Sequence, residues 1–242
     1  MPTLTSSTVS LSMNEAKFFF TRAAVGAGVP FGLGEDFAAA SIWLAGQGID
    51  PAKISAPALS ALAEGRSSRR ITRGKNASAT HFVDADGQTI SALFAGPAVA
   101  DWMQVASAIR KEIIATIVCV DQPALIAAYM AIEGFEAGLV EITWPGRKGK
   151  SFNVEIGPNS VNGLIASVQD NKPPSPAKVT VVFKPHNPIS EDIWLQADPR
   201  IEVVDVAAEP WKVVMEFFKK CLVPSSEQSL EQGAGAGLKD ND

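Results

Sequence analysis

Hydrophobic positions recur at helical spacing in the first half of the chain and alternate with polar positions in the second half. Ser12 and Glu15 in SMNE stand three residues apart, as in a capping box, so a helix is predicted to begin here. Gly26 and Gly28 are the expected terminators, since glycine accepts the left-handed conformation at a helix end. Between them, apolar residues follow at intervals of one, three and four: Ala16, Phe19, Phe20, Ala23 and Ala24.

A second helix is predicted from about Glu35 to Ala45, after the glycine-rich stretch GAGVPFGLGED. That stretch has two interpretations: a tight helix–helix connection, or a flexible loop at the mouth of a ligand site. A third helix is predicted to start at Asp50–Pro51 or, as a second possibility, at Ser55 with Pro57 just inside, and to end at Gly65.

Two further helices are expected in the middle of the chain. PAVADWMQVASAI has Pro97 near its first turn, and DQPALIAAYMAIEGF has Asp121 as its cap and Gly134 near its end. The run HFVDADGQTISALFAGP is predicted to form a β-hairpin that turns at Asp86–Gly87. The apolar run EIIATIVCV is predicted to be a buried strand.

Beyond residue 137, short alternating runs separated by turns predict an antiparallel meander. The runs are LVEITW, SFNVEI, GLIASV and KVTVVF, and RIEVVDV is expected to add a strand. PGRKGK, residues 145–150, is a basic turn and is expected to be a hairpin loop. SEDIWLQA is predicted to be a short helix capped by Ser190. EPWKVVMEFFKKCL predicts an amphipathic helix whose buried side carries Val213, Val214, Phe217 and Phe218.

Together these elements predict an α+β fold, with a helical N-terminal part packed on a mixed or mainly antiparallel sheet. We expect residues 1–10 to be disordered and residues 11–230 to form one domain, with a subdivision conceivable near residue 137. Residues 231–242 are glycine-rich and are expected to be ordered.

Composition narrows the function classes. The 46% hydrophobic and 19% charged residues predict a folded globular protein, and the net charge of −5 argues against a nucleic-acid partner. The first ten residues lack the features of a signal peptide, and no apolar run is long enough to span a bilayer, so a cytoplasmic protein without a membrane partner is expected. The scattered cysteines and histidines predict no metal site, and no nucleotide-binding motif predicts a cofactor.

The strongest candidate for ligand binding is the basic segment RSSRRITRGK, residues 66–75. Guanidinium groups bind carboxylates and phosphates through two hydrogen bonds, so this segment suits a small anionic metabolite. The alternative is a solvated loop whose charges keep the surface soluble. The candidate ligand-binding residues are Arg66, Arg69, Arg70, Arg73 and Lys75.

Candidates for acid–base chemistry are carboxylates in different environments and one histidine near the basic segment: Glu35, Asp36, His81, Asp240 and Asp242. For His81, a purely structural role is the alternative. The segment GAGAGLKDND, residues 233–242, is either a linker-like tail or an ordered segment anchored by Leu238 that presents its acids to a pocket or a neighbouring chain.

Two stretches resemble an uncharacterised bacterial family, the domain of unknown function 3726. LSMNEAKFFFTRAAVGAGVPFGLGEDFAAASIWLAGQG is similar to its N-terminal pattern, and SSEQSLEQGAGAGLKDND to its C-terminal pattern; together they cover about a quarter of the chain. Where the family tends to have an arginine before the first GAG, this chain has Val25, and Arg22 one helical turn earlier is only a partial substitute. The resemblance implies a bacterial cytoplasmic protein and supplies no reaction.

Two hypotheses follow. The first is a metabolic protein that binds a small anionic metabolite through the basic segment; whether it is an enzyme stays open. The second is a non-catalytic assembly or partner subunit, in a homo-oligomer or another complex, whose C-terminal segment docks on another chain.

Overall fold

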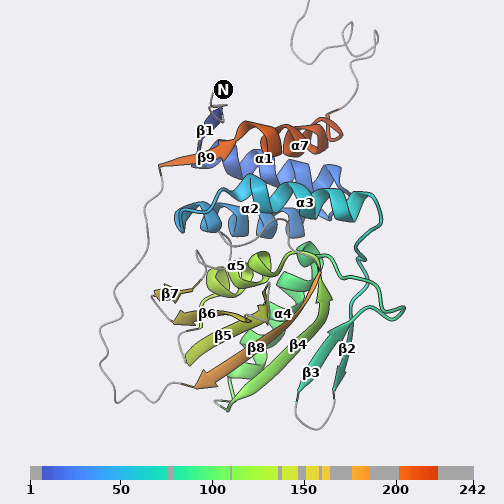
Figure 1. Cartoon of the computed structure of the whole chain (residues 1–242), viewed down its shortest axis with the longest axis vertical. Coiled ribbons are helices and arrows are strands. Elements are labelled where there is room, and N and C mark those ends of the chain that lie inside the picture. The colour runs from blue at the N-terminus through green and yellow to red at the C-terminus, as the bar shows by residue number, and fades with distance from the viewer. Residues whose placement is uncertain are drawn as a thin grey trace, which may run out of the picture.

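The computed structural model describes residues 7–75, 79–109, 111–135, 138–146, 151–157, 160–163, 176–185 and 202–222. In chain order its elements are β1 (Thr8–Ser12), α1 (Met13–Gly26), α2 (Phe31–Gly46), α3 (Pro51–Ala63), β2 (Thr72–Lys75), β3 (Thr80–Val83), α4 (Ala92–Ser107), β4 (Ile113–Val120), α5 (Pro123–Glu133), β5 (Gly138–Pro145), β6 (Ser151–Gly157), β7 (Ser160–Asn162), β8 (Ala177–Pro185), β9 (Val203–Ala207) and α7 (Ala208–Lys219). Figure 1 shows α1, α2, α3 and α7 at one end of the molecule and a seven-stranded sheet at the other.

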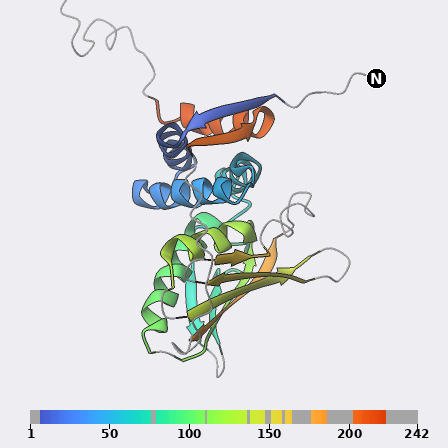
Figure 2. The same ribbon diagram turned by 90° about the vertical axis from the view of Figure 1, so that its left-hand side faces the viewer.

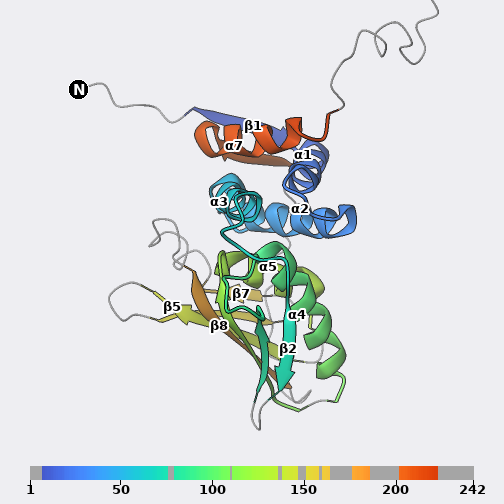
Figure 3. The same ribbon diagram turned by 90° about the vertical axis from the view of Figure 1, so that its right-hand side faces the viewer.

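The sheet is mixed, which together with the helices confirms the α+β prediction. Its strand order is β2-β3-β4-β8-β5-β6-β7, and only the β3–β4 pair of named strands is parallel. Helix α4 contacts β4 and β8, and α5 contacts β5 and β6, so that both helices cover one face of the sheet (Figures 2 and 3). Helix α2 packs on α5 and α4, which connects the N-terminal helices to the sheet.

The predicted strands at β4, β5, β6, β8 and β9 are confirmed, as is the hairpin that joins β5 to β6. Their burial alternates along β5 and β8, as expected for strands with one face on the core. Residues 164–168 of the predicted GLIASV strand, residues 147–150 of the basic turn and the predicted helix SEDIWLQA lie outside the described residues.

The predicted hairpin across Asp86–Gly87 is wrong. Gly87 does turn the chain there, with φ of 71°, but β3 pairs with β2 and with β4. The second half of the expected hairpin contributes only Ile90, which forms parallel bridges to Ser68 and Val120. The next residue, Ser91, caps α4 by accepting a hydrogen bond from the Leu93 N–H, so the apolar run turns into a helix instead of returning along β3.

Helix α1 begins as predicted. The Ser12 hydroxyl accepts a hydrogen bond from the Glu15 N–H, and the Glu15 carboxylate accepts one from the Ser12 N–H at 2.8 Å. The two Ser12 hydrogen bonds lower the pKa of Glu15. The helix ends at Gly26, and Gly28 has the left-handed backbone expected of a terminator, with φ of 88°.

Ser12→Ala is expected to lower the free energy of unfolding by about 1 kcal/mol, because it removes the hydroxyl half of the capping box. Ser12→Thr is the matched control, since it keeps a hydroxyl at the cap. Urea unfolding of both variants measures the effect. Equal stability of the two variants would contradict a capping role for Ser12.

Helix α2 is longer than the sequence predicted, and α3 follows the first of its two predicted starts. Helix α2 begins at Phe31, directly after Pro30, so the connection from α1 shrinks to residues 27–30. Helix α3 starts at the predicted Asp50 cap, which accepts a hydrogen bond from the Ala52 N–H at 3.0 Å, and it continues through Pro57. The second predicted start at Ser55 is therefore wrong.

Helices α4 and α5 differ from the prediction at their first turns. Helix α4 starts five residues before Pro97, which lies in its interior. Helix α5 has Gln122, not Asp121, at its cap position. The Asp121 carboxylate instead accepts a hydrogen bond at 2.8 Å from the N–H of Ala92, the first residue of α4.

A small layer of β1, β9 and α7 covers the N-terminal helices. Strand β1 pairs antiparallel with β9, so Thr8–Ser10 are in a strand although the sequence predicted disorder for them. Helix α7 buries Val214 and Phe217 as predicted, together with Trp211, and Phe218 is half-buried. Val213 is exposed, which corrects its predicted place on the buried side.

Candidate functional site

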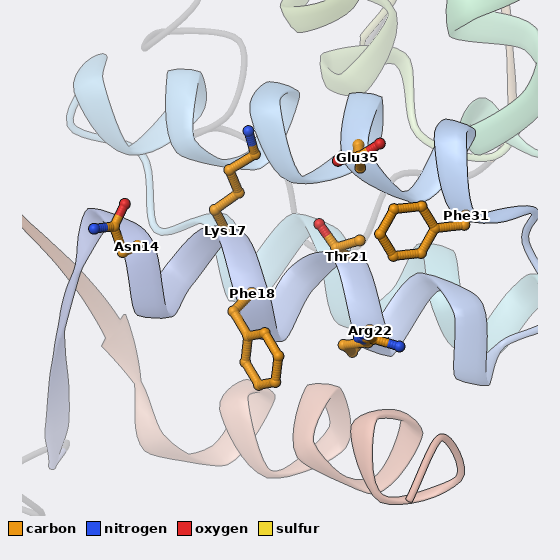
Figure 4. Close-up of a pocket in the computed structure, with 7 residues that line it drawn as sticks. All are labelled: Asn14, Lys17, Phe18, Thr21, Arg22, Phe31 and Glu35. Atoms are coloured by element: carbon orange, nitrogen blue, oxygen red, sulfur yellow. The ribbon is translucent and has the colours of Figure 1, made fainter.

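A hollow of about 240 Å³ lies between α1 and α2 and is called the α1–α2 pocket below (Figure 4). Helix α1 contributes one polar stripe and one phenyl ring to it, and the first turns of α2 close the other side. The residues that line it are Asn14, Lys17, Phe18, Thr21, Arg22, Phe31 and Glu35.

Two cations of this pocket have no ion-pair partner among the described residues. Lys17 and Arg22 form no salt bridge there, whereas Lys53, Arg66, Arg70, Lys184, Lys212 and Lys219 each do. The Arg22 guanidinium lies between two rings instead, 5.5 Å from the centroid of Phe31 and 5.9 Å from that of Phe18. Both rings are about half exposed, at 50% and 51%. Cation–π contact holds the guanidinium without neutralising it.

Close packing of α1 on α2 forms the pocket. Gly34 lies on the buried side of α2, where an added Cβ would be 3.0 Å from the Thr21 carbonyl oxygen and 3.6 Å from Ala24 Cβ. A larger residue at 34 would push the helices apart. The absence of a side chain there sets Phe31 and Glu35, on neighbouring turns of α2, against the polar stripe of α1.

Two predicted acid–base candidates are adjacent on α2, and only Glu35 lines the pocket. Partial burial raises the pKa of Asp36, with further contributions from the negative charges of Asp101 and Glu35. Asp240 and Asp242 lie outside the described residues.

The basic segment does not gather around one hollow. Arg66 pairs with Glu64 at 2.6 Å, and Arg70 pairs with Asp86 and lies 3.7 Å from Asp84. The Arg69 guanidinium lies against Gly28, and its Nη2 donates to the Ala27 carbonyl oxygen at 3.4 Å, at the negative end of the α1 dipole.

The remaining residues of the segment lie on β2. Arg73 is exposed and forms no salt bridge within the described part of the chain, and Lys75 ends the strand. His81 lies on the neighbouring β3, opposite Gly74 and beside Thr116 of β4. Neither Arg73 nor His81 lines the α1–α2 pocket.

Asp84 organises the turn that carries the basic segment. Its buried carboxylate accepts hydrogen bonds from the Ser68 hydroxyl at 2.6 Å and the Asp86 N–H at 2.8 Å. The Ser68 hydrogen bond is the largest cause of the lowered pKa of Asp84. The role of Asp84 is therefore structural.

A second hollow, of about 400 Å³, lies where β9 meets the N-terminus of α3. Its charged groups are already engaged. Asp50 accepts hydrogen bonds from the N–H groups of Ala52 and Ala207, Lys53 lies 3.7 Å from Asp50, and Asp205 accepts a hydrogen bond from Ser10. An anion would therefore find fewer free cationic groups in this hollow than in the α1–α2 pocket.

A buried polar cluster lies where β4 leads into α5. Four atoms there are buried without a hydrogen-bond partner among the described residues: Ser67 Oγ, Asp121 Oδ2, Gln122 Oε1 and the Tyr129 hydroxyl. Burial raises the pKa of Asp121 to about 6; the Ala92 N–H opposes this shift, and so does the nearby Ser67 hydroxyl, although its geometry falls short of a hydrogen bond. Burial also raises the pKa of Tyr129 well above its usual range.

The sequence alone did not single out the residues of the α1–α2 pocket, apart from Glu35 and the partial substitute Arg22. A signal was present: Phe18 falls outside the apolar stripe of α1, and it shares a neighbouring, mostly polar stripe with Asn14, Lys17, Thr21 and Arg22. Among the described residues, no three His, Cys, Asp or Glu side chains come together as metal ligands. No helix in that part of the chain has the length and hydrophobicity needed to cross a bilayer.

A comparison with known families confirms the resemblance noted in the sequence for the N-terminal third of the chain. The family described as "Protein of unknown function (DUF3726)" matches residues 11–82. Residues 11–82 are therefore similar to this family. They contain every residue that lines the α1–α2 pocket and the whole basic segment. No curated protein matches the sequence.

The likeness to solved structures extends beyond residues 11–82 and covers most of the chain. Malate dehydrogenase from Pyrococcus horikoshii OT3 is 10% identical with a TM-score of 0.58, over 93% of this chain and 99% of that one. Malate dehydrogenase from Entamoeba histolytica is 7% identical with a TM-score of 0.57, over 90% and 99%. A dehydrogenase from Sinorhizobium meliloti is 12% identical with a TM-score of 0.54, over 88% and 100%. These likenesses show a shared fold.

Proposed function

We propose that this protein binds a small anionic metabolite, a carboxylate or a phosphate, in the α1–α2 pocket. The observation that carries the proposal is the pair Lys17 and Arg22, which line one hollow without an acidic partner among the described residues. A guanidinium already held between two rings loses little conformational freedom when it binds a carboxylate.

The remaining groups of the pocket restrict the ligand. Glu35 is its one acidic side chain and accepts a hydrogen bond from a hydroxyl or ammonium group, which favours a ligand that carries such a group beside its anionic group. The volume of about 240 Å³ is below the ~300–1,000 Å³ of pockets for drug-sized ligands, so a small metabolite fits better than a dinucleotide. Malate, a hydroxy acid named in two of the similar structures, has this chemistry.

The basic segment contributes to the same region through Arg69. Its contact with Ala27 and Gly28 fixes the connection between the two pocket helices. Direct ligand contact by Arg66, Arg70, Arg73 or Lys75 is the competing form of the proposal. We also propose that the protein is bacterial and cytoplasmic, as its resemblance to this family implies.

Thermal unfolding with malate, citrate and inorganic phosphate tests the site, because a ligand that binds only the folded state raises its stability. We expect at least one of these probes to raise the Tm. Arg22→Gln is expected to weaken the binding of that probe about tenfold or more, since hydrogen bonds to charged groups contribute about 1.5–3 kcal/mol. Arg66→Gln removes the same charge from the basic segment and is expected to bind normally.

Two outcomes would contradict the α1–α2 pocket as the site. One is a Tm increase that Arg66→Gln or Arg73→Gln abolishes and Arg22→Gln leaves intact. The other is the absence of any increase with all three probes at millimolar concentration.

A further inference from the structure

The face around the α1–α2 pocket is apolar and cationic at once. Two half-exposed phenyl rings, Phe18 and Phe31, flank the Arg22 guanidinium, and Lys17 lies one turn away on α1. Large aromatic side chains that stay exposed next to unpaired cations are typical of a surface that another segment covers. A free metabolite in the pocket contacts only part of these rings.

The chain leaves the described structure beside this face. Helix α7 packs along α1, and the Cys221 thiol donates a hydrogen bond to the Arg22 carbonyl oxygen at 2.9 Å. The Phe218 ring of the same helix lies 5.7 Å from the Phe18 ring. Leu222 is the last described residue, and residues 223–242 follow it.

The segment that follows has the complementary chemistry. Residues 223–242 contain four acids and one lysine, a net charge of −3, and two leucines. The acids are Glu227, Glu231, Asp240 and Asp242, the lysine is Lys239, and the leucines are Leu230 and Leu238. Asp240 follows Leu222 by eighteen positions, and the random-coil estimate of end-to-end distance for that number of residues is about 25 Å, similar to the ~21 Å length of α1.

We propose that residues 223–242 dock on this face of their own chain. Leu238 packs against Phe18 and Phe31, and the carboxylates of Asp240 and Asp242 lie against Lys17 and Arg22. A tether this short gives an effective concentration in the millimolar range, above that of a second chain at micromolar protein concentration. A contact with a dissociation constant of about 0.1 mM would then be about 90% occupied within the same chain.

Docking has a consequence for ligand binding that rests on the proposed function. The two aspartates occupy the position of the anionic metabolite, so the segment competes with it. Asp240→Asn with Asp242→Asn in the full chain is expected to tighten binding of the responding probe about tenfold, in line with the occupancy given above.

Amide hydrogen exchange of the full chain tests the docking without any ligand. The amides of residues 223–242 are expected to exchange about tenfold more slowly than those of the same sequence as a free peptide, because a docked segment is protected for most of the time. The double variant Lys17→Gln/Arg22→Gln is expected to return them to the free rate. Lys212→Gln/Lys219→Gln is the matched control, since it removes two exposed charges from α7 and is expected to keep the protection.

Three outcomes overturn the docking. Exchange at the free-peptide rate in the unmodified chain would show that the segment covers nothing. Equal loss of protection in both double variants would show a general charge effect. Protection that grows with protein concentration, together with a dimer mass, would assign the face to the segment of a second chain. If protection is found and no anionic probe binds even the Asp240→Asn/Asp242→Asn variant, the proposed function fails and the docking stands. If a probe binds and no protection is found, the docking fails and the proposed function stands.

Discussion

Gly96→Ala is expected to lower the free energy of unfolding by about 3 kcal/mol, the upper part of the range for overpacked cores. Gly96 lies on the buried side of α4, where the Tyr129 ring of α5 covers it. A Cβ added at this position would be 1.9 Å from Tyr129 Cδ2 and 2.4 Å from its Cε2. Tyr129 is only 2% exposed, so its ring has no free space into which to move.

The matched control is Gly32→Ala in α2, where an added Cβ meets no atom within 4 Å. Alanine is the better helix former, so this variant is expected to be neutral or stabilising by up to about 1 kcal/mol. Urea unfolding of both variants measures the difference. A double-mutant cycle with Tyr129→Leu adds a second check, because Gly96→Ala should cost less once the ring is absent. Equal effects of the two alanines would show that α4 and α5 are not in close contact at Gly96.

Asp121→Asn is expected to change how stability depends on pH. Burial raises the pKa of Asp121 from 3.8 to about 6 in the folded state. Between these two values the unfolded chain releases the proton while the folded protein retains it, so the free energy of unfolding falls as pH rises. The loss is about 3 kcal/mol by pH 7, because one pKa unit corresponds to about 1.4 kcal/mol. Asparagine is neutral throughout and keeps an acceptor for the Ala92 N–H.

Urea unfolding between pH 4 and pH 7 measures this effect. Relative to the unmodified chain, the Asp121→Asn variant should gain about 2.5 kcal/mol over that range, since part of the effect lies below pH 4. Asp84→Asn should show the opposite sign, and below pH 4: hydrogen bonds lower the pKa of Asp84 from 3.8, so its contribution to stability is present above that value and is lost as pH falls through the folded-state pKa. Parallel pH profiles for Asp121→Asn and the unmodified chain would show that folding does not raise the pKa of Asp121.

Prediction from sequence was most accurate where the signal is local. The Ser12–Glu15 capping box fixed the start of α1, and the Asp50–Pro51 pair fixed the start of α3. The alternating runs of β5, β6 and β8 were recognisable because successive side chains of a strand point to opposite faces. These features depend only on residues a few positions apart.

The candidate site was less predictable for the same reason. Charge density along the chain favoured residues 66–75, but partners distant in sequence engage two of those arginines: Ala27 accepts from Arg69, and Asp84 and Asp86 lie against Arg70. A cation in the pocket such as Lys17 is isolated in the sequence and carries no charge signal. Which charges stay unpaired depends on contacts across the fold, and sequence spacing does not report them.

The sequence by itself determined the fold class and most of the helices and strands, because capping, helical spacing and strand alternation act over a few residues. Only the tertiary structure decided which strands pair and which polar groups are free. Gly34 lies within helix α2 where α1 packs so closely that an added Cβ would be 3.0 Å from the Thr21 carbonyl oxygen, and Asp121 caps the distant α4 instead of its own helix. These outcomes depend on neighbours brought together by the whole fold, whose interactions outweigh the local preference of a single residue.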